Sequence, residues 1–293
     1  AKWAVEQLKK KHDKPFFMGV GFYRPHVPMY ASQKWFDMHP RKKIKLPLVR
    51  KNDRNDLSQY AIDLTNLNHV SPTHKWVSEA GQWDHAVQSY LASVTFADHC
   101  LGLVLDALES SDYAGNTVIA LFSDHGFHLG EKERWAKRSL WEDGTRVPII
   151  VSAPDYQKDQ RSARPAELLD VFPTLLELAG LPADPSQEGQ SLVPLMKNPK
   201  KEWDHPAITS FGLGNYSIRT TRYRFIQYFD GSRELYDLSK DPHEWKNLAA
   251  DPKNKSIIEE HAAHLPRKQH PILPGSSTGH AAYGAANANI KKD

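Results

Sequence analysis

A long amphipathic segment followed directly by a short apolar run is the strongest limit on how this chain can fold. From Asp84 onward, apolar residues recur at every third or fourth position as far as Leu108, and this spacing predicts a helix that ends at SSDYAGN. The apolar run at residues 118–122 then predicts a strand that is buried on both faces. A helix followed by such a strand is typical of α/β proteins.

A second stretch repeats this order further along the chain. The sequence RVPIIVSAP predicts a strand over residues 147–152. ELLDVFPTLLELAGLP predicts a helix that ends at Gly180, because glycine followed closely by proline is a common helix C-terminus. Residues 16–22 are also apolar and predict another buried strand.

The last third of the chain changes character. Short alternating segments in YSIRTTRYRFIQYF and GSRELYDL predict a small antiparallel sheet, with a helix over residues 255–264. The tail is rich in Gly, Ala and Asn and low in apolar bulk, so we expect it to be disordered. These changes predict three parts, at residues 1–205, 206–265 and 266–293.

Residues 32–82 have no clear periodicity and many Asn, Asp, Lys and Pro residues. A loop of this length in a compact fold is often an insertion or lid that faces a substrate. A surface excursion without a function remains an equal alternative.

Composition excludes several classes of protein. The net charge of +3 is spread along the sequence and gives no reason to expect nucleic acid as a partner. Cys100 is the single cysteine, which excludes an internal disulfide and a cysteine-rich zinc site. We expect no membrane span, since no run approaches the roughly 18 to 20 apolar residues that a spanning helix needs. The two glycosylation sequons, at Asn215 and Asn254, are weak signals.

The candidate functional residues follow the strand at 118–122. Asp124 and His125 stand at its end, where ligands of open α/β sheets collect, although an Asp-His pair can also simply cap a turn. Gly126 permits a sharp turn, Lys137 adds a cation, and His26 lies between two prolines that favour an extended backbone. Such a set suits a metal-assisted reaction on a phosphate or sulfate ester.

Five motifs in order carry a resemblance to a known family. They are PFFMGVGFYRPHVP, QSYLASVTFADHCLGLVLDALE, SDHGFHLGEKERWAKRSLWEDGTRVPIIVSAP, DVFPTLLELAGL and YSIRTTRYRFIQY. Together they resemble the sulfatases of the alkaline-phosphatase-like superfamily, above all the iduronate-type branch, over residues 15–247. The resemblance implies an α/β sandwich with a mostly parallel central sheet, incomplete at its N-terminus, and a small C-terminal antiparallel subdomain.

The resemblance also implies roles for individual residues. Asp124 and His125 would be ligands of a Ca²⁺ ion, His26 would donate a proton to the leaving oxygen, and Lys137 would contact the sulfate. The implied substrate is a sulfate ester on a sulfated carbohydrate. The implied compartment is periplasmic, secreted or lysosome-like.

The chain departs from the family pattern at its beginning. The motif Cys-x-Pro-Ser-Arg, or its serine version, is not found, and Cys100 is followed by Leu-Gly-Leu-Val in a predicted helix. In sulfatases the first residue of that motif becomes formylglycine, the nucleophile. We therefore expect a C-terminal portion that is inactive alone. Because calcium prefers oxygen ligands, His125 leaves a metal-dependent phosphoesterase as an alternative, and a non-catalytic binding protein is another.

Overall fold

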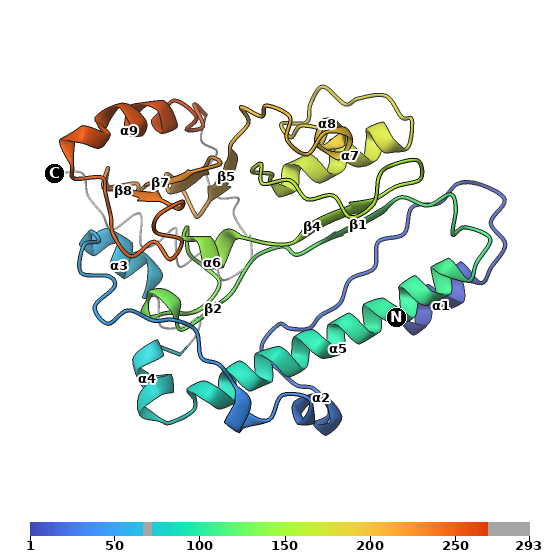
Figure 1. The fold of residues 1–293 in the computed structure, drawn as a ribbon, viewed down its shortest axis with the longest axis horizontal. Coiled ribbons are helices and arrows are strands. Elements are labelled where there is room, and N and C mark those ends of the chain that lie inside the picture. The colour runs from blue at the N-terminus through green and yellow to red at the C-terminus, as the bar shows by residue number, and fades with distance from the viewer. Residues whose placement is uncertain (67–71, 269–293) are drawn as a thin grey trace. The chain divides into compact units, whose positions relative to one another are not determined.

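The computed structural model describes residues 1–66 and 72–268 (Figure 1). The chain divides into two compact units, one formed by Ala1–Pro47 and Lys75–Thr117 and the other by Leu48–His74 and Val118–Asp293. Most of the predicted disordered tail, from residue 269 on, lies outside the described residues, and the predicted boundary at residue 206 stays a prediction.

The first unit is organised by one long helix. Helix α5 (Trp83–Glu109) confirms the predicted helix, and α1 (Lys2–Leu8) and α2 (Gln33–Asp37) pack against it. The Tyr113 hydroxyl donates to the Lys10 carbonyl at 2.9 Å and ties the end of the α5 region to the segment after α1. The 3₁₀ helix η1 (Arg41–Lys43) and helix α4 (His74–Glu79) complete the helical elements of this region.

Helix α5 is the one described helix that is long and apolar enough to cross a membrane by length and composition. This finding differs from the sequence expectation of no such run. It is weak evidence for a membrane span, because helices in the core of globular proteins meet the same criterion.

The second unit contains a two-stranded ribbon. Strands β1 (Ile119–Phe122) and β4 (Ile149–Ser152) confirm the two predicted strands, but they pair antiparallel, with Ile119 opposite Ser152. A parallel pair needs a long crossover, usually a helix. The connection holds only the hairpin of β2 (His128–Leu129) and β3 (Trp135–Ala136), the 3₁₀ helix η2 (Glu131–Glu133) and the four-residue helix α6 (Glu142–Thr145).

Burial of these strands is also lower than predicted. Phe122 is 48% exposed and Ile150 is 56% exposed, so neither strand is covered on both faces in the described chain. The strand predicted at residues 16–22 does not form among the described residues, and Phe17 there is 87% exposed. An extended segment becomes a strand only when a neighbour takes up its backbone hydrogen bonds.

The C-terminal sheet is antiparallel, as predicted. It consists of β5 (Ala207–Ser210), β6 (Tyr216–Arg219), β7 (Tyr223–Gln227) and β8 (Arg233–Asp237), in that order. Helix α9 (Lys255–Ala262), which matches the predicted helix, follows the 3₁₀ helix η4 (Pro252–Asn254). Its Ile258 packs with Ile218, Phe225 and Leu235 of the sheet, so α9 covers one face (Figure 1).

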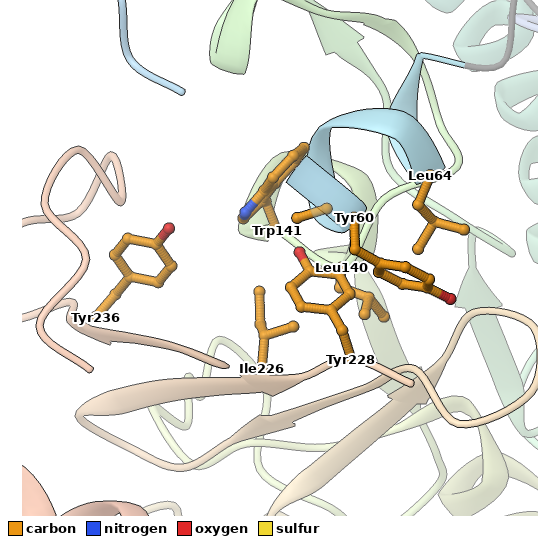
Figure 2. Close-up of a cluster of buried hydrophobic side chains, with 8 residues drawn as sticks. Tyr60, Leu64, Leu140, Trp141, Ile226, Tyr228 and Tyr236 are labelled. Atoms are coloured by element: carbon orange, nitrogen blue, oxygen red, sulfur yellow. The ribbon is translucent and has the colours of Figure 1, made fainter. Parts of the chain in front are cut away.

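A second cluster lies on the other side of this sheet's core strands. Figure 2 shows Ile226, Tyr228 and Tyr236 from the sheet facing Leu140 and Trp141, with Tyr60 and Leu64 of helix α3 (Gln59–Thr65) beside them. The segment that lacked periodicity therefore supplies part of the core. A seven-residue helix is too short to show a pattern, but Ser58 caps it by accepting from the Ala61 amide at 3.1 Å.

The remaining elements lie between β4 and β5. The 3₁₀ helix η3 (Leu168–Asp170) leads into α7 (Val171–Leu178), and α8 (Val193–Lys197) follows. Gly180 has a φ of +66°, and the Leu181 amide donates to the Leu176 carbonyl at 2.9 Å. The predicted glycine C-terminus of this helix is thereby confirmed.

Candidate functional site

Asp124 and His125 follow β1 directly, as the sequence predicts. Asp124 Oδ2 and His125 Nε2 are 3.4 Å apart, with side chains 82% and 30% exposed. His125 Nδ1 lies 2.8 Å from the Gly126 carbonyl. Since a carbonyl oxygen only accepts, Nδ1 carries the proton in the neutral ring and Nε2 keeps its lone pair. The pair therefore presents a carboxylate oxygen and an imidazole nitrogen side by side.

Gly126 is required for a different reason from the one predicted. The φ angle of Gly126 is not positive, so the backbone conformation alone does not call for glycine. A Cβ at this residue would instead lie 2.1 Å from the Asp143 carbonyl oxygen and 2.9 Å from that of Arg146. The Gly126 amide donates to the Gly144 carbonyl at 3.0 Å. The turn that carries Asp124 and His125 thus rests directly on the backbone of α6.

The segment between β2 and α6 is held by polar contacts inside the protein. His128 is fully buried, and its Nε2 lies 2.6 Å from the Ser139 hydroxyl. Burial lowers the pKa of His128 to about 3, so its ring is neutral near pH 7 and forms a hydrogen bond with the Ser139 hydroxyl as a neutral group. A Cβ at Gly144 would lie 2.2 Å from Ser139 Oγ, which shows how closely α6 approaches this segment. Lys137 follows β3 and is half-buried between these contacts.

One cavity of about 1830 Å³ within the second unit is lined by Asp124, His125 and Lys137 together. Eight lysine and arginine side chains and four carboxylates line it, so its surface carries an excess of positive charge. Such a surface raises the local concentration of anions. The structure therefore brings three of the four predicted site residues to one anion-attracting surface.

His26 lies in the first unit, whereas the other three residues belong to the second. The sequence predicted an extended backbone, but the His26 amide donates to the Tyr23 carbonyl at 3.0 Å and closes a turn. His26 Nδ1 lies 2.6 Å from the Val27 carbonyl, and the ring stacks on Tyr23 with centroids 4.9 Å apart. The ring is exposed at this surface.

Sequence reasoning missed an arginine pair at the cavity. Arg219 and Arg224 both line it, and both form ion pairs with Glu142 of α6. Burial alone would raise the pKa of Glu142, but the two guanidinium groups lower it below its usual value. The alternating pattern of β6 and β7 predicted the strands that carry these arginines, but no local signal indicated their shared partner.

Two groups of potential metal ligands were also missed. In the described part of the chain, three-residue groups of ligand atoms within 4.8 Å of one another are formed by His128, Glu131 and Asp143 and by Glu167, Asp170 and His205. Burial raises the pKa of both carboxylates in the first group. Neither group includes Asp124 or His125, which form a pair.

Comparisons with known proteins agree with the sequence motifs. The fold is that of alkaline-phosphatase-like hydrolases: a phosphonate monoester hydrolase of Agrobacterium radiobacter superposes with a TM-score of 0.75 at 23% identity, over 89% of this chain and 57% of that chain. The sulfatase family model matches residues 1–181, and that of the N-sulphoglucosamine sulphohydrolase C-terminal region matches residues 130–270. The chain belongs to the sulfatase family.

Two curated relatives show how much of a sulfatase the chain covers. It is 43% identical to a sulfatase of Formosa agariphila over 90% of this chain and 52% of that protein. It is 29% identical to the iduronate 2-sulfatase of Mus musculus over 87% of this chain and 61% of that protein. The chain thus spans roughly half to three-fifths of the length of these two relatives.

Sulfatases generally use a metal ion, and the Asp124–His125 pair fits one. Two ligand atoms that bind one cation at right angles through bonds of roughly 2.4 Å lie about 3.4 Å apart. The Asp124 and His125 ligand atoms have this spacing. The carboxylate oxygen is the harder ligand of the two, and the neutral Nε2 is free of the backbone contact that holds Nδ1.

Proposed function

We propose that the chain is the C-terminal part of a sulfatase that hydrolyses sulfate esters on a sulfated carbohydrate. The observation that carries this proposal is the common cavity of Asp124, His125 and Lys137, with its excess of cations. A sulfate ester is an anion, and sulfated sugars carry several negative charges. The similarity to iduronate 2-sulfatase supports a sugar acid as the sulfated group.

The rest of a longer protein would complete the site. The chain covers 52% and 61% of the two relatives, and the cavity is larger than the roughly 300–1,000 Å³ of most small-molecule sites. Ile150 of β4 lines this cavity and is 56% exposed, as expected if another part of the full protein packs on this strand. The formylglycine nucleophile would lie in that remaining part, so we expect this chain to be inactive by itself.

Asp124 and His125 would hold Ca²⁺ through a carboxylate oxygen and Nε2. The ion, when bound, would orient the sulfate group and offset its charge. Lys137 lines the same cavity as Asp124 and His125. Its ammonium group would stabilise the negative charge that develops on the sulfate. No ion pair involves Lys137 among the described residues, so its charge is available to an anion.

His26 would donate a proton to the leaving oxygen of the sugar. Its Nδ1 is held by the Val27 carbonyl, which leaves Nε2 of the imidazolium as the group that can release a proton outward. A positioned acid is typically worth about 10²- to 10⁴-fold in rate, because an alkoxide is a poor leaving group.

The experiment is an assay of the full-length protein that contains this chain. Turnover of an aryl sulfate and of a 2-sulfated uronic acid would be measured with Ca²⁺, for wild type, His26→Ala and Asp124→Asn. We expect His26→Ala to lower kcat by about two orders of magnitude or more, and Asp124→Asn to lose its Ca²⁺, measured by elemental analysis of calcium. The matched controls are His85→Ala and Asp112→Asn, which change exposed side chains of the same types. Wild-type turnover in His26→Ala, or unchanged metal content in Asp124→Asn, would reject the corresponding role.

The same assay tests the two alternatives. A metal-dependent phosphoesterase is favoured by His125, because imidazole is a more usual ligand of zinc than of calcium. Turnover of phosphate or phosphonate esters above that of sulfate esters would select it. Binding of sulfated sugars without turnover of any ester would select the non-catalytic protein. The expected periplasmic, secreted or lysosome-like location follows from the family alone.

A further inference from the structure

The second group of ligand-type side chains lies on elements that the proposed sulfatase chemistry does not use. Glu167 precedes η3 and Asp170 ends it, and His205 stands just before β5. The Glu167 and Asp170 side chains are 10% and 0% exposed, and that of His205 is 19% exposed. Two carboxylates and an imidazole thus meet inside the protein, and Glu167 also lines the cavity that holds Asp124 and His125.

The spacing in this group is too long for hydrogen bonds. His205 Nε2 lies 3.6 Å from Glu167 Oε1 and 3.6 Å from Asp170 Oδ1. The Nε2 atom is buried and has no hydrogen-bond partner among the described residues. Hydrogen bonds to a charged carboxylate are normally about 2.7–2.9 Å long. This buried nitrogen therefore makes only two long contacts with carboxylates, and a bound ion would give it a ligand bond.

A metal ion fits this spacing. Ligand atoms on neighbouring corners of a tetrahedron with bonds of roughly 2.1 Å lie about 3.4 Å apart. Both distances from His205 Nε2 are close to that value. The third edge is also short enough, because the three ligand atoms all lie within 4.8 Å of one another.

Backbone amides already hold both carboxylates in place. The Ile208 amide donates to Glu167 Oε2 at 2.7 Å, and the Glu167 amide donates to Asp170 Oδ2 at 2.9 Å. The Gln190 amide donates to Asp170 Oδ1 at 2.8 Å, which leaves a second lone pair on that oxygen. Such outer contacts orient the ligands of protein metal sites.

We propose that Glu167, Asp170 and His205 form a second metal site that binds a zinc-class ion. One imidazole and two carboxylates suit Zn²⁺ better than Ca²⁺, and they leave a fourth position for water. The ion would join η3 and the start of α7 to β5. The site is separate from the Asp124–His125 pair and holds whether or not the protein is a sulfatase.

The experiment uses the full-length protein with Asp124→Asn and His125→Gln, so that the first pair contributes no binding. After chelator treatment, Zn²⁺ is titrated by calorimetry, and Co²⁺ is used as a probe because its visible absorption reports tetrahedral ligands, whereas Ca²⁺ gives none. We expect one equivalent per chain and a tetrahedral Co²⁺ spectrum. Glu167→Gln, which keeps the shape and the Ile208 contact, should weaken binding at least about tenfold, a loss comparable to that of removing outer-shell partners.

His205→Gln should abolish the tetrahedral Co²⁺ spectrum, and His264→Gln, an exposed histidine near the end of α9, should leave it unchanged. If His205→Gln does not fold, Glu167→Gln still decides the question. No binding beyond background, or equal affinity in Glu167→Gln, would overturn the proposal and indicate a metal-free imidazolium between two carboxylates.

Discussion

The substitution Gly126→Ala tests whether the site turn depends on close contact with α6. The added methyl carbon would lie 2.1 Å from the Asp143 carbonyl oxygen, so one backbone must move by about 1 Å to restore ordinary contact. Overpacking of this kind costs about 1–3 kcal/mol. The Gly126–Gly144 hydrogen bond would be strained as well, adding about 0.5–1.5 kcal/mol. We therefore expect a loss of about 1.5–4.5 kcal/mol in unfolding free energy.

The assay is urea unfolding followed by tryptophan fluorescence, with the transition midpoint and slope compared between variants. Gly115→Ala is the matched control, because a methyl group there meets nothing within 4 Å and the φ is not positive. It should be neutral or stabilising by about 0.4–1 kcal/mol. If Gly126→Ala stays within about 0.5 kcal/mol of wild type, the usual range of neutral surface changes, the argument that this glycine positions Asp124 and His125 is wrong.

Two further predictions concern the interior. Burial lowers the pKa of His128 to about 3, so between about pH 6.5 and 3 the unfolded chain binds more protons than the folded one. The unfolding free energy of the wild type should therefore fall on acidification, by up to about 1.4 kcal/mol per pH unit. His128→Gln should lose that part of the slope in urea midpoints from pH 7 to 5, and an identical slope would contradict it. Phe225 is fully buried, so Phe225→Ala should lower the free energy of unfolding by about 3–5 kcal/mol. The control Phe17→Ala changes a side chain that is 87% exposed and should lower it by less than about 0.5 kcal/mol. An equally small loss in Phe225→Ala would refute the core role of Phe225.

Local patterns predicted most of the elements. The long helix α5, strands β1 and β4, the glycine end after α7 and the antiparallel C-terminal sheet are all recognisable from periodicity and turn residues. The same patterns misread residues 16–22 and residues 32–82. In the first case the segment has no partner strand in the described chain, and in the second a short helix joins the core through Tyr60 and Leu64. Pairing and burial are properties of the whole fold that a short window does not contain.

The sequon at Asn215 illustrates the same limit. Its side chain is fully buried, donates to the Phe211 carbonyl at 2.9 Å and is held by the Phe229 amide at 3.0 Å. A glycosylated asparagine would lie at the surface, whereas the buried Asn215 side chain links two backbone segments through hydrogen bonds. A three-residue pattern carries no information about burial.

The sequence by itself determined the family and named Asp124, His125 and Lys137, because their chemistry depends on residue type at the end of a strand. Only the tertiary structure shows that these three residues line one cavity together with Arg219 and Arg224. It also brought Glu167, Asp170 and His205 together from separate elements. Charges and ligands act over a few ångströms, and residues that lie tens of positions apart reach that distance only when the chain has folded.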